Sequence, residues 1–178
     1  LDAKGEVKCI VVKGRADYSR KQTDELQEFV KRYSAGALAW IKVGDETTSS
    51  LLKVLGEAKI ADLAAKTGAE KGDAVLIVGG RKSVVAASLG ALRLEVAKRE
   101  KLIPDGVFKS LLVIDFPLFE YNDAEHHYDA AHHPFTSPMD EDLEQFKQAV
   151  ETGDRSLLGG IRAKAYDAVV NGIEVAGG

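Results

Sequence analysis

Residues 162–175 read RAKAYDAVVNGIEV, and this stretch predicts a β-hairpin. Residues 162–170 are β-prone, and a second β-prone run at 173–175 follows the dipeptide Asn171-Gly172. Asn-Gly between two such runs favours a type I′ turn, because both residues accept the positive φ angles that this turn requires. We therefore expect two antiparallel strands joined at Asn171-Gly172.

Two carboxylates flank this turn. Counting outward from it, Val169 faces Glu174 across the hairpin, and Asp167 then faces Ala176. Asp167 and Glu174 lie on one face as diagonal neighbours, with Cα atoms roughly 7 Å apart. Oxygen ligands at that separation suit a Mg²⁺ ion that also takes phosphate oxygens. The alternative is a pair of solvated carboxylates, which is the more common role beside a turn.

The first half of the chain alternates strands with amphipathic helices, whereas the second half is more irregular. In the first half we expect strands at 7–12, 37–43 and 74–78, and helices at 19–33, 51–55, 60–66 and 83–102. In the second half we expect a strand at 110–114, a hairpin-like turn at 121–128, a short acidic helix at 139–150 and a loop at 153–160. The alternation predicts a two-layer α/β domain for the first half.

Local signals define the ends of these elements and the packing of the longest helix. Ser19 is the expected N-cap of the helix at 19–33, and Gly79-Gly80 is expected to end the strand at 74–78. The apolar face of the helix at 83–102 is expected to consist of Val84, Ala87, Leu89, Leu92, Leu94 and Val96. Pro104 marks the end of that helix.

The composition excludes several classes of protein. The 178 residues are 45% apolar and 29% charged, as in a typical globular chain, and no apolar run reaches the length of about 18 residues that a membrane span needs. Cys9 is the only cysteine, which excludes an internal disulfide and a multi-thiolate zinc site and favours the cytoplasm. The chain begins at Leu1 and its only methionine is Met139, so we expect an excised piece of a larger protein.

The net charge of −4 conceals an uneven distribution. Residues 1–110 hold 20 Lys and Arg against 15 Asp and Glu, whereas residues 111–178 hold 4 against 13. A mildly basic module suits a polyanionic partner, and an acidic one suits a metal-bound nucleotide. Neither interpretation is specific alone, because lysine-rich helices are usually just solvated faces, and an acidic patch also suits simple solvation.

The histidines are His126, His127, His132 and His133, all within eight residues. A zinc site made from two of them with Asp129 or Glu125 would lack a second ligand cluster, and the sequence has no HExxH motif. We expect the first two histidines on a solvated loop. Pro134 restricts the backbone directly after the second pair, so a functional role for His132 and a structural one stay equally open.

Six segments resemble bacterial aspartyl-tRNA synthetases, in the same order and over essentially the whole chain. They are SRKQTDELQEFVKRY (19–33), GALAWIKV (36–43), GALRLEVAKREKLI (90–103), DFPLFEY (115–121), AHHPFTSP (131–138) and AYDAVVNGIEVAGG (165–178). The resemblance implies an α+β chain with a GAD insertion domain at 1–107. At 108–178 it implies part of the antiparallel sheet of a class II synthetase catalytic domain.

The resemblance also implies roles for particular residues. The family's aspartate-binding histidine matches His132, and the acidic residues that hold ATP and its Mg²⁺ match Asp167 and Glu174. Ala176 departs from the glycine that is usual at its position. The family's arginines for the ATP phosphate and the substrate carboxylate have no counterpart here, so the catalytic set is incomplete. We therefore expect the chain alone to be inactive.

The parent enzyme implied by this resemblance is a cytoplasmic homodimer that binds aspartate, ATP and tRNA and no membrane. For the first half, a role in binding tRNA and a role as a structural spacer both stay open, with an autonomous GAD module as a third alternative. The cations that discriminate between these roles are Arg15, Arg20, Lys21, Arg81 and Lys82. Clustering on one face favours RNA, and scatter favours a spacer.

Overall fold

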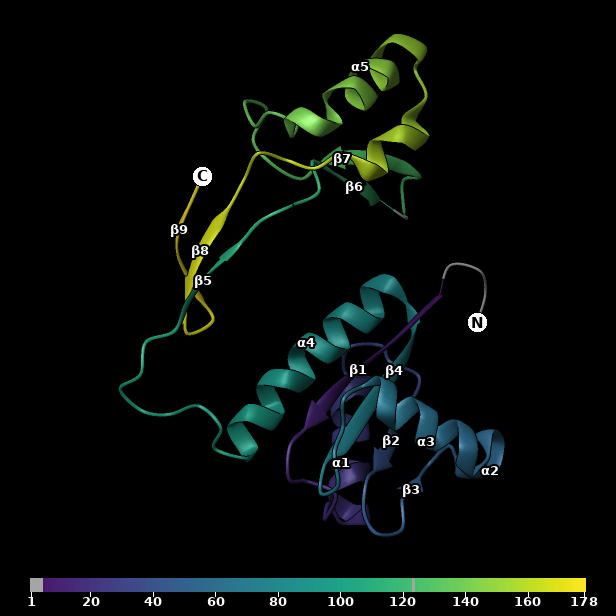
Figure 1. The fold of residues 1–178 in the computed structure, drawn as a ribbon. Helices are drawn as coiled ribbons and strands as arrows, with labels where there is room; N and C mark the ends of the chain where they lie inside the picture. Colours follow the sequence, from purple (N-terminus) through teal and green to yellow (C-terminus); the bar gives the residue numbers. More distant parts are fainter. Residues whose placement is uncertain (1–4, 123) are drawn as a thin grey trace. The chain divides into compact units, whose positions relative to one another are not determined.

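The computed structural model describes residues 5–122 and 124–178. The chain divides into two compact units, Leu1–Pro104 and Asp105–Gly178 (Figure 1). Each unit combines helices with antiparallel strands, so the mixed α and β class with antiparallel sheets is confirmed. Among the helices of the described residues, none is long and apolar enough to cross a membrane.

The first unit is built on a four-stranded antiparallel sheet. Its order is β1 (Gly5–Val12), β4 (Ala74–Arg81), β2 (Ala39–Lys42) and β3 (Thr48–Ser49). Strand β4 continues through Gly79 and Gly80, so the prediction that these glycines end the strand is wrong. Their backbones stay paired with Val7 and Glu6 of β1, and this ladder keeps the strand extended.

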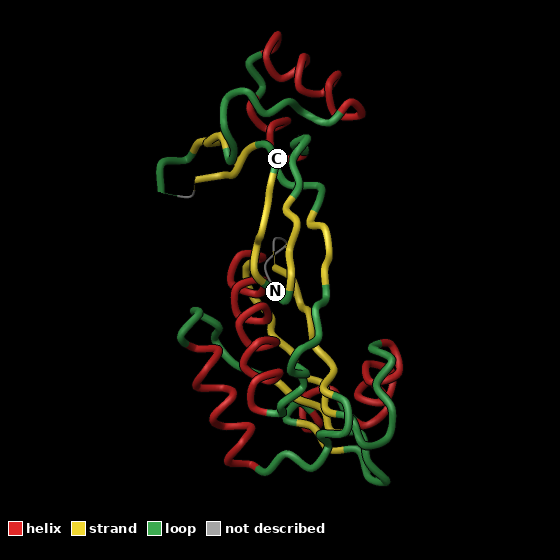
Figure 2. Tube along the Cα trace, turned by 90° about the vertical axis from the view of Figure 1, so that its left-hand side faces the viewer, coloured by secondary structure: helices red, strands yellow, loops and turns green. Residues whose placement is uncertain are grey.

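Helices cover both faces of this sheet. They are α1 (Arg20–Lys31), α2 (Leu52–Leu55), α3 (Glu57–Lys66) and α4 (Lys82–Arg99). Figure 2 shows helices on both sides of the strands of this sheet. Leu76 and Val78 pack with α1 and α4, whereas Val75 packs with α2 and α3 from the opposite face. The expected two-layer packing is therefore wrong, because the unit has three layers. The run AVLIV at 74–78 is apolar at every position since both of its faces are buried.

The two long helices follow their sequence signals to different extents. Ser19 caps α1 as predicted: its Oγ accepts from the Gln22 N–H at 3.3 Å, and the Gln22 side chain accepts from the Ser19 N–H at 2.8 Å. The buried face of α4 consists of Val85, Ser88, Leu89, Leu92 and Val96. Ala87 and Leu94 are exposed, so their predicted places on this face are wrong. Each lies two residues after a buried position, about 200° around the helix.

The second unit holds two small sheets and short helices. Its elements are β5 (Ser110–Val113), β6 (Phe119–Asn122), β7 (His127–Ala130), a 3₁₀ helix (Asp140–Asp142), α5 (Leu143–Thr152), a second 3₁₀ helix (Arg155–Gly160), β8 (Asp167–Val170) and β9 (Ile173–Gly177). The sheets are β5-β8-β9 and β6-β7. A small core forms around Leu118, Ile161 and Ala163.

Two predictions for this unit have different outcomes. The hairpin expected at 121–128 is present as the β6–β7 pair, although residue 123 lies outside the described residues. The loop expected at 153–160 is wrong, because most of it forms a 3₁₀ helix. The carboxylate of Asp154 caps that helix by accepting from the backbone N–H of Ser156 at 3.0 Å.

Candidate functional site

The β8–β9 hairpin turns at Asn171-Gly172, as the sequence predicts. Both residues have positive φ, 50° and 82°. Val169 pairs with Glu174, also as predicted, but Asp167 pairs with Gly177 and not with Ala176. The register shifts between Ala168 and Val169, because a β-bulge inserts one extra residue into β9. The predicted partner of Asp167 is therefore wrong.

The bulged hairpin brings the carboxylates of Asp167 and Glu174 to the same glycine. A Cβ placed on Gly177 would lie 3.0 Å from Oδ1 of Asp167 and 3.1 Å from Oε1 of Glu174. Since both oxygens lie about 3 Å from one point, they are at most about 6 Å apart. Within the described residues, neither carboxylate takes part in a hydrogen bond or a salt bridge.

This arrangement fits a divalent cation. Two carboxylates that have no partner among the described residues leave oxygen lone pairs available, and a side chain at Gly177 would crowd both of them. Glu174 is exposed and Asp167 is partly buried, so the pair is open to a ligand from solvent. Asp167 and Glu174 are the residues that could hold Mg²⁺, with the remaining positions taken by water or phosphate oxygens.

His132 lies in the loop that precedes the acidic helix α5. Its ring packs edge-on against Phe116, with the centroids 5.5 Å apart and the planes at 75°. The carbonyl of Phe116 accepts from the backbone N–H of Ala163 at 2.7 Å, on the segment that leads into Asp167. His132 therefore contacts, through Phe116, the backbone segment that leads from Ala163 into Asp167. Within the described residues it makes no hydrogen bond to the carboxylate of Asp167 or Glu174. A pocket shared by all three residues stays a prediction.

Two of the remaining histidines, His127 and His133, have local partners. A ring nitrogen of His127 lies 2.7 Å from Oδ1 of Asp129, and the amide of Asn122 and then this ring keep the pKa of Asp129 below its ordinary value. The ring of His133 packs against Phe135. Within residues 5–122 and 124–178, no group of three or more His, Cys, Asp or Glu side chains is arranged to hold a metal ion.

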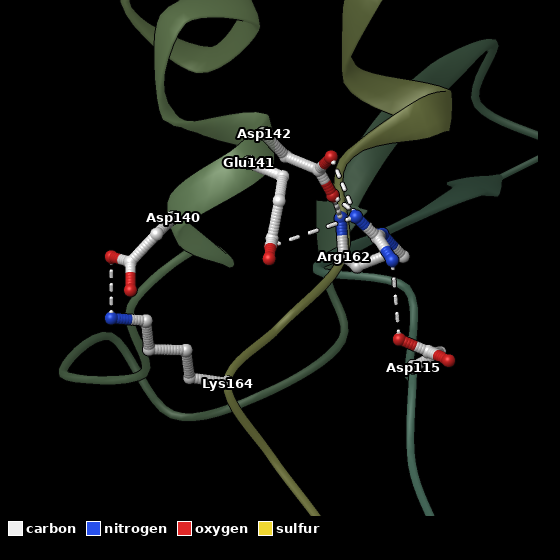
Figure 3. Close-up of polar contacts among 6 residues, drawn as sticks. All are labelled: Asp115, Asp140, Glu141, Asp142, Arg162 and Lys164. Atoms are coloured by element: carbon white, nitrogen blue, oxygen red, sulfur yellow. Dashed lines mark hydrogen bonds and ion pairs between the residues drawn. The ribbon is translucent and has the colours of Figure 1, made fainter.

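Arg162 joins the start of the acidic helix to the strand segment before Asp167 (Figure 3). Its Nε donates to Asp142 Oδ2 at 2.8 Å, a terminal nitrogen donates to Asp142 Oδ1 at 3.0 Å, and its backbone N–H donates to the same carboxylate at 2.9 Å. Asp115 lies 3.3 Å away and Glu141 3.8 Å. These bonds lower the pKa of Asp142 and raise that of Arg162.

The Arg162 contacts were not foreseen from the sequence. The only available signal was compositional: few cations lie among the many carboxylates of residues 111–178, so each cation has several possible partners. Lys164 follows the same pattern and contacts Asp140 at 2.6 Å. Backbone bonds from Met139 to Arg162 and from Lys164 to Ser137 pin the residues that follow the His132 loop. The cluster therefore positions that loop beside the strand segment.

The five cations whose clustering would favour RNA binding do not form one patch on the first unit. They are Arg15, Arg20, Lys21, Arg81 and Lys82. Arg15 is bonded to Glu100, at the end of α4, whereas Arg81 and Lys82 lie at its start. Because α4 has 18 residues, the two groups are separated by a helix of about 27 Å. Arg20 is within 3.8 Å of Asp24, which partly neutralises it.

Two hollows open on the described surface. A groove of about 750 Å³ between α1 and α4 is lined by four cations, four carboxylates and an aromatic ring: Arg20, Lys21, Asp24, Glu25, Glu28, Phe29, Arg32, Glu95 and Arg99. A second hollow of about 450 Å³ lies beside α5. Neither is lined by His132, Asp167 or Glu174. The balanced charges of the first groove give no preference for a polyanion.

Residues 1–89 match the GAD domain family, which defines the class of the first unit. The match covers half of the chain, and the chain belongs to the GAD domain family.

Known enzymes extend the similarity over the whole length. The chain is 49% identical to an aspartate-tRNA(Asp/Asn) ligase of Symbiobacterium thermophilum over 181 aligned residues, covering 100% of this chain and 30% of the relative. It is 46% identical to an aspartate-tRNA ligase of Clostridium botulinum and 47% identical to one of Staphylococcus carnosus, covering 29% of each. The resemblance seen in the sequence is confirmed. The chain spans about 30% of the length of these relatives.

Proposed function

We propose that this chain is part of an aspartate-tRNA ligase. The observation that carries the proposal is the convergence of the Asp167 and Glu174 carboxylates at Gly177, in a chain 49% identical throughout to such a ligase. The parent enzyme joins aspartate to the α-phosphate of ATP, releases pyrophosphate, and passes the aspartyl group to tRNA. We further propose that it is a cytoplasmic homodimer.

Residues 1–107 are proposed to be the GAD insertion domain, and residues 108–178 part of the class II catalytic domain. The exposed sheet of the second unit supports the second assignment. Leu111 and Leu112 are neighbours on β5, so they point to opposite faces, yet they are 57% and 63% exposed. Apolar residues on both faces indicate that further polypeptide covers this sheet.

Each site residue has a proposed task. Asp167 and Glu174 hold Mg²⁺, and Glu174 also contacts ATP; the ion supplies positive charge that offsets the charge of the phosphates. His132 contacts the substrate aspartate, with its ring orientation set by Phe116. The open face of the hairpin leaves both carboxylates accessible to a nucleotide.

The test is aspartate-dependent exchange of pyrophosphate into ATP by the full-length ligase that contains this chain. We expect Asp167→Asn and Glu174→Gln to lower the exchange rate by at least about tenfold, and His132→Ala to raise chiefly the KM for aspartate. Glu120→Gln, an exposed carboxylate on β6 of the same unit, is the matched control. Equal rates for the two site variants and the control would contradict the assignment.

The chain alone is proposed to be inactive in this assay. Activation of an acyl group requires stabilisation of charge on phosphorus by several precisely placed groups, and this chain supplies one wall of such a site. Exchange by the isolated 178-residue chain at the rate of a full ligase would overturn this part of the proposal.

A spacer role for the GAD unit is the second candidate, favoured over direct tRNA contact by the placement of its cations. Arg15 contacts Glu100 at the end of α4, Arg81 and Lys82 lie at its start, and Arg20 and Lys21 begin α1. Arg15 and Arg20 are also paired with carboxylates. Filter binding of the isolated chain to tRNA at two salt concentrations separates the candidates. Tight binding that weakens steeply with salt supports tRNA contact, and weak binding supports the spacer.

A further inference from the structure

Asn171 makes contacts that its turn does not need. Its side-chain Oδ1 accepts from the backbone N–H of Lys109 at 2.8 Å, and its Nδ2 donates to the carbonyl of Val107 at 2.9 Å. Its backbone N–H also donates to the carbonyl of Lys109 at 2.9 Å. The turn itself requires only a positive φ, which glycine supplies at least as well.

These bonds extend the sheet along the segment that enters the second unit. The β5–β8 ladder ends with Ser110 opposite Val170, and the backbone bond of Asn171 adds one further pair. Beyond it the main chain of the hairpin turns away, and the amide of Asn171 takes over the bonds to residues 107–109. Phe108 is 83% exposed, so apolar packing does not hold this segment.

Asparagine is the residue whose side chain suits this position. Its amide has both an acceptor and donors, so it bonds an N–H and a C=O of the same extended segment. Aspartate retains the acceptor and lacks the donor, and glycine lacks both, yet each tolerates the left-handed backbone of the turn. Substitution by these two residues therefore separates the link from the turn.

We propose that Asn171 is a positioning residue that ties the connection between the two units to the turn joining the strands of Asp167 and Glu174. The amide holds residues 107–109 in place, and Asn171 itself lies three residues before Glu174. The connection coming from the GAD unit is thereby anchored at the carboxylate hairpin. The consequence for metal binding rests on the function proposed above, whereas the link itself does not.

Amide hydrogen exchange on the 178-residue chain tests the link. We expect Asn171→Gly to speed exchange of the Lys109 amide by about threefold, since one exposed hydrogen bond is lost, and Asn171→Asp to leave it near the original rate. The β1 and β4 amides of the first unit are the internal control. An unchanged Lys109 amide in Asn171→Gly overturns the proposal. Equal loosening of the whole β5–β8 ladder also overturns it, because Asn171 would then be a general determinant of the sheet.

Pyrophosphate exchange by the full-length ligase tests the positioning. We expect Asn171→Gly to raise the Mg²⁺ concentration for half-maximal activity by about threefold and to leave the KM for aspartate within about twofold. Unchanged Mg²⁺ dependence overturns the positioning role. Asp167→Asn and Glu174→Gln are measured in the same assay. If these two variants also leave the Mg²⁺ dependence unchanged, the proposed function fails. The hydrogen-exchange rate of the Lys109 amide still decides whether the link exists.

Discussion

The sequence places Leu92 and Leu94 on one apolar face of α4, but replacing each of them by alanine should change the stability of the first unit by very different amounts. Leu92 is fully buried against the sheet, whereas Leu94 is 54% exposed. Leu92→Ala loses about 2 kcal/mol of hydrophobic transfer free energy and also leaves a cavity. We therefore expect the free energy of unfolding to fall by about 3 kcal/mol. Leu94→Ala loses much less burial and gains helix propensity, so we expect a change of at most about 0.5 kcal/mol.

Urea unfolding followed by tryptophan fluorescence measures this difference. Trp40 is the only tryptophan of the chain and lies against the core that contains Leu92, so its emission reports the first unit. With a slope of about 1.5 kcal/mol/M, Leu92→Ala should lower the midpoint by about 2 M. Similar midpoints for the two variants, or a larger loss for Leu94→Ala, would refute the burial assigned to α4.

Three further predictions concern a salt bridge, a helix cap and the carboxylate pair. Hydrogen bonds, chiefly from Lys13, lower the pKa of Asp73 from 3.8 to about 2, so its stabilisation is complete above pH 3.8 and is lost as the pH falls to about 2. Asp73→Asn should remove this part of the pH dependence of urea unfolding, and an unchanged profile counts against the pair. Ser19→Ala should cost about 1 kcal/mol in the same assay, and no loss would mean that the cap is not formed. Gly177→Ala should displace both carboxylates and raise the Mg²⁺ requirement of the full-length ligase, and an unaltered requirement argues against their convergence.

The local features of the fold were predictable from the sequence. The Asn171-Gly172 turn and the Ser19 cap depend on backbone angles and bonds within a few residues, so residue type is enough to indicate them. The covering of both sheet faces was also present as a signal, in the uninterrupted apolar run at 74–78. Alternation of strands and helices alone gave the wrong number of layers, because it does not say which face each helix covers.

Features that depend on distant residues were not predictable. The β-bulge shifts the partner of Asp167 by one residue, and nothing in the composition of β9 distinguishes it from a regular strand. The contact between Arg162 and Asp142 joins residues 20 apart, and the amide of Asn171 reaches a segment 62 residues away. In such cases the sequence supplies the chemical groups, and only the fold brings them together.

For the candidate site, the sequence predicted that two carboxylates lie near each other but did not predict the details of their geometry. Asp167 and Glu174 were expected on one face of the hairpin, and they do converge, although at Gly177 and through a bulge. His132 was chosen by resemblance, and its packing on Phe116 had no sequence signal.

A double-mutant cycle on Asp167 and Glu174 tests the shared carboxylate site most directly. The rate of pyrophosphate exchange by the full-length ligase is measured at saturating ATP for Asp167→Asn, Glu174→Gln and the double variant. If one Mg²⁺ ion bridges the two carboxylates, the double variant is barely slower than the more damaged single variant, because either change already disrupts the ion. If the two losses multiply, the carboxylates act independently, and the shared site is contradicted.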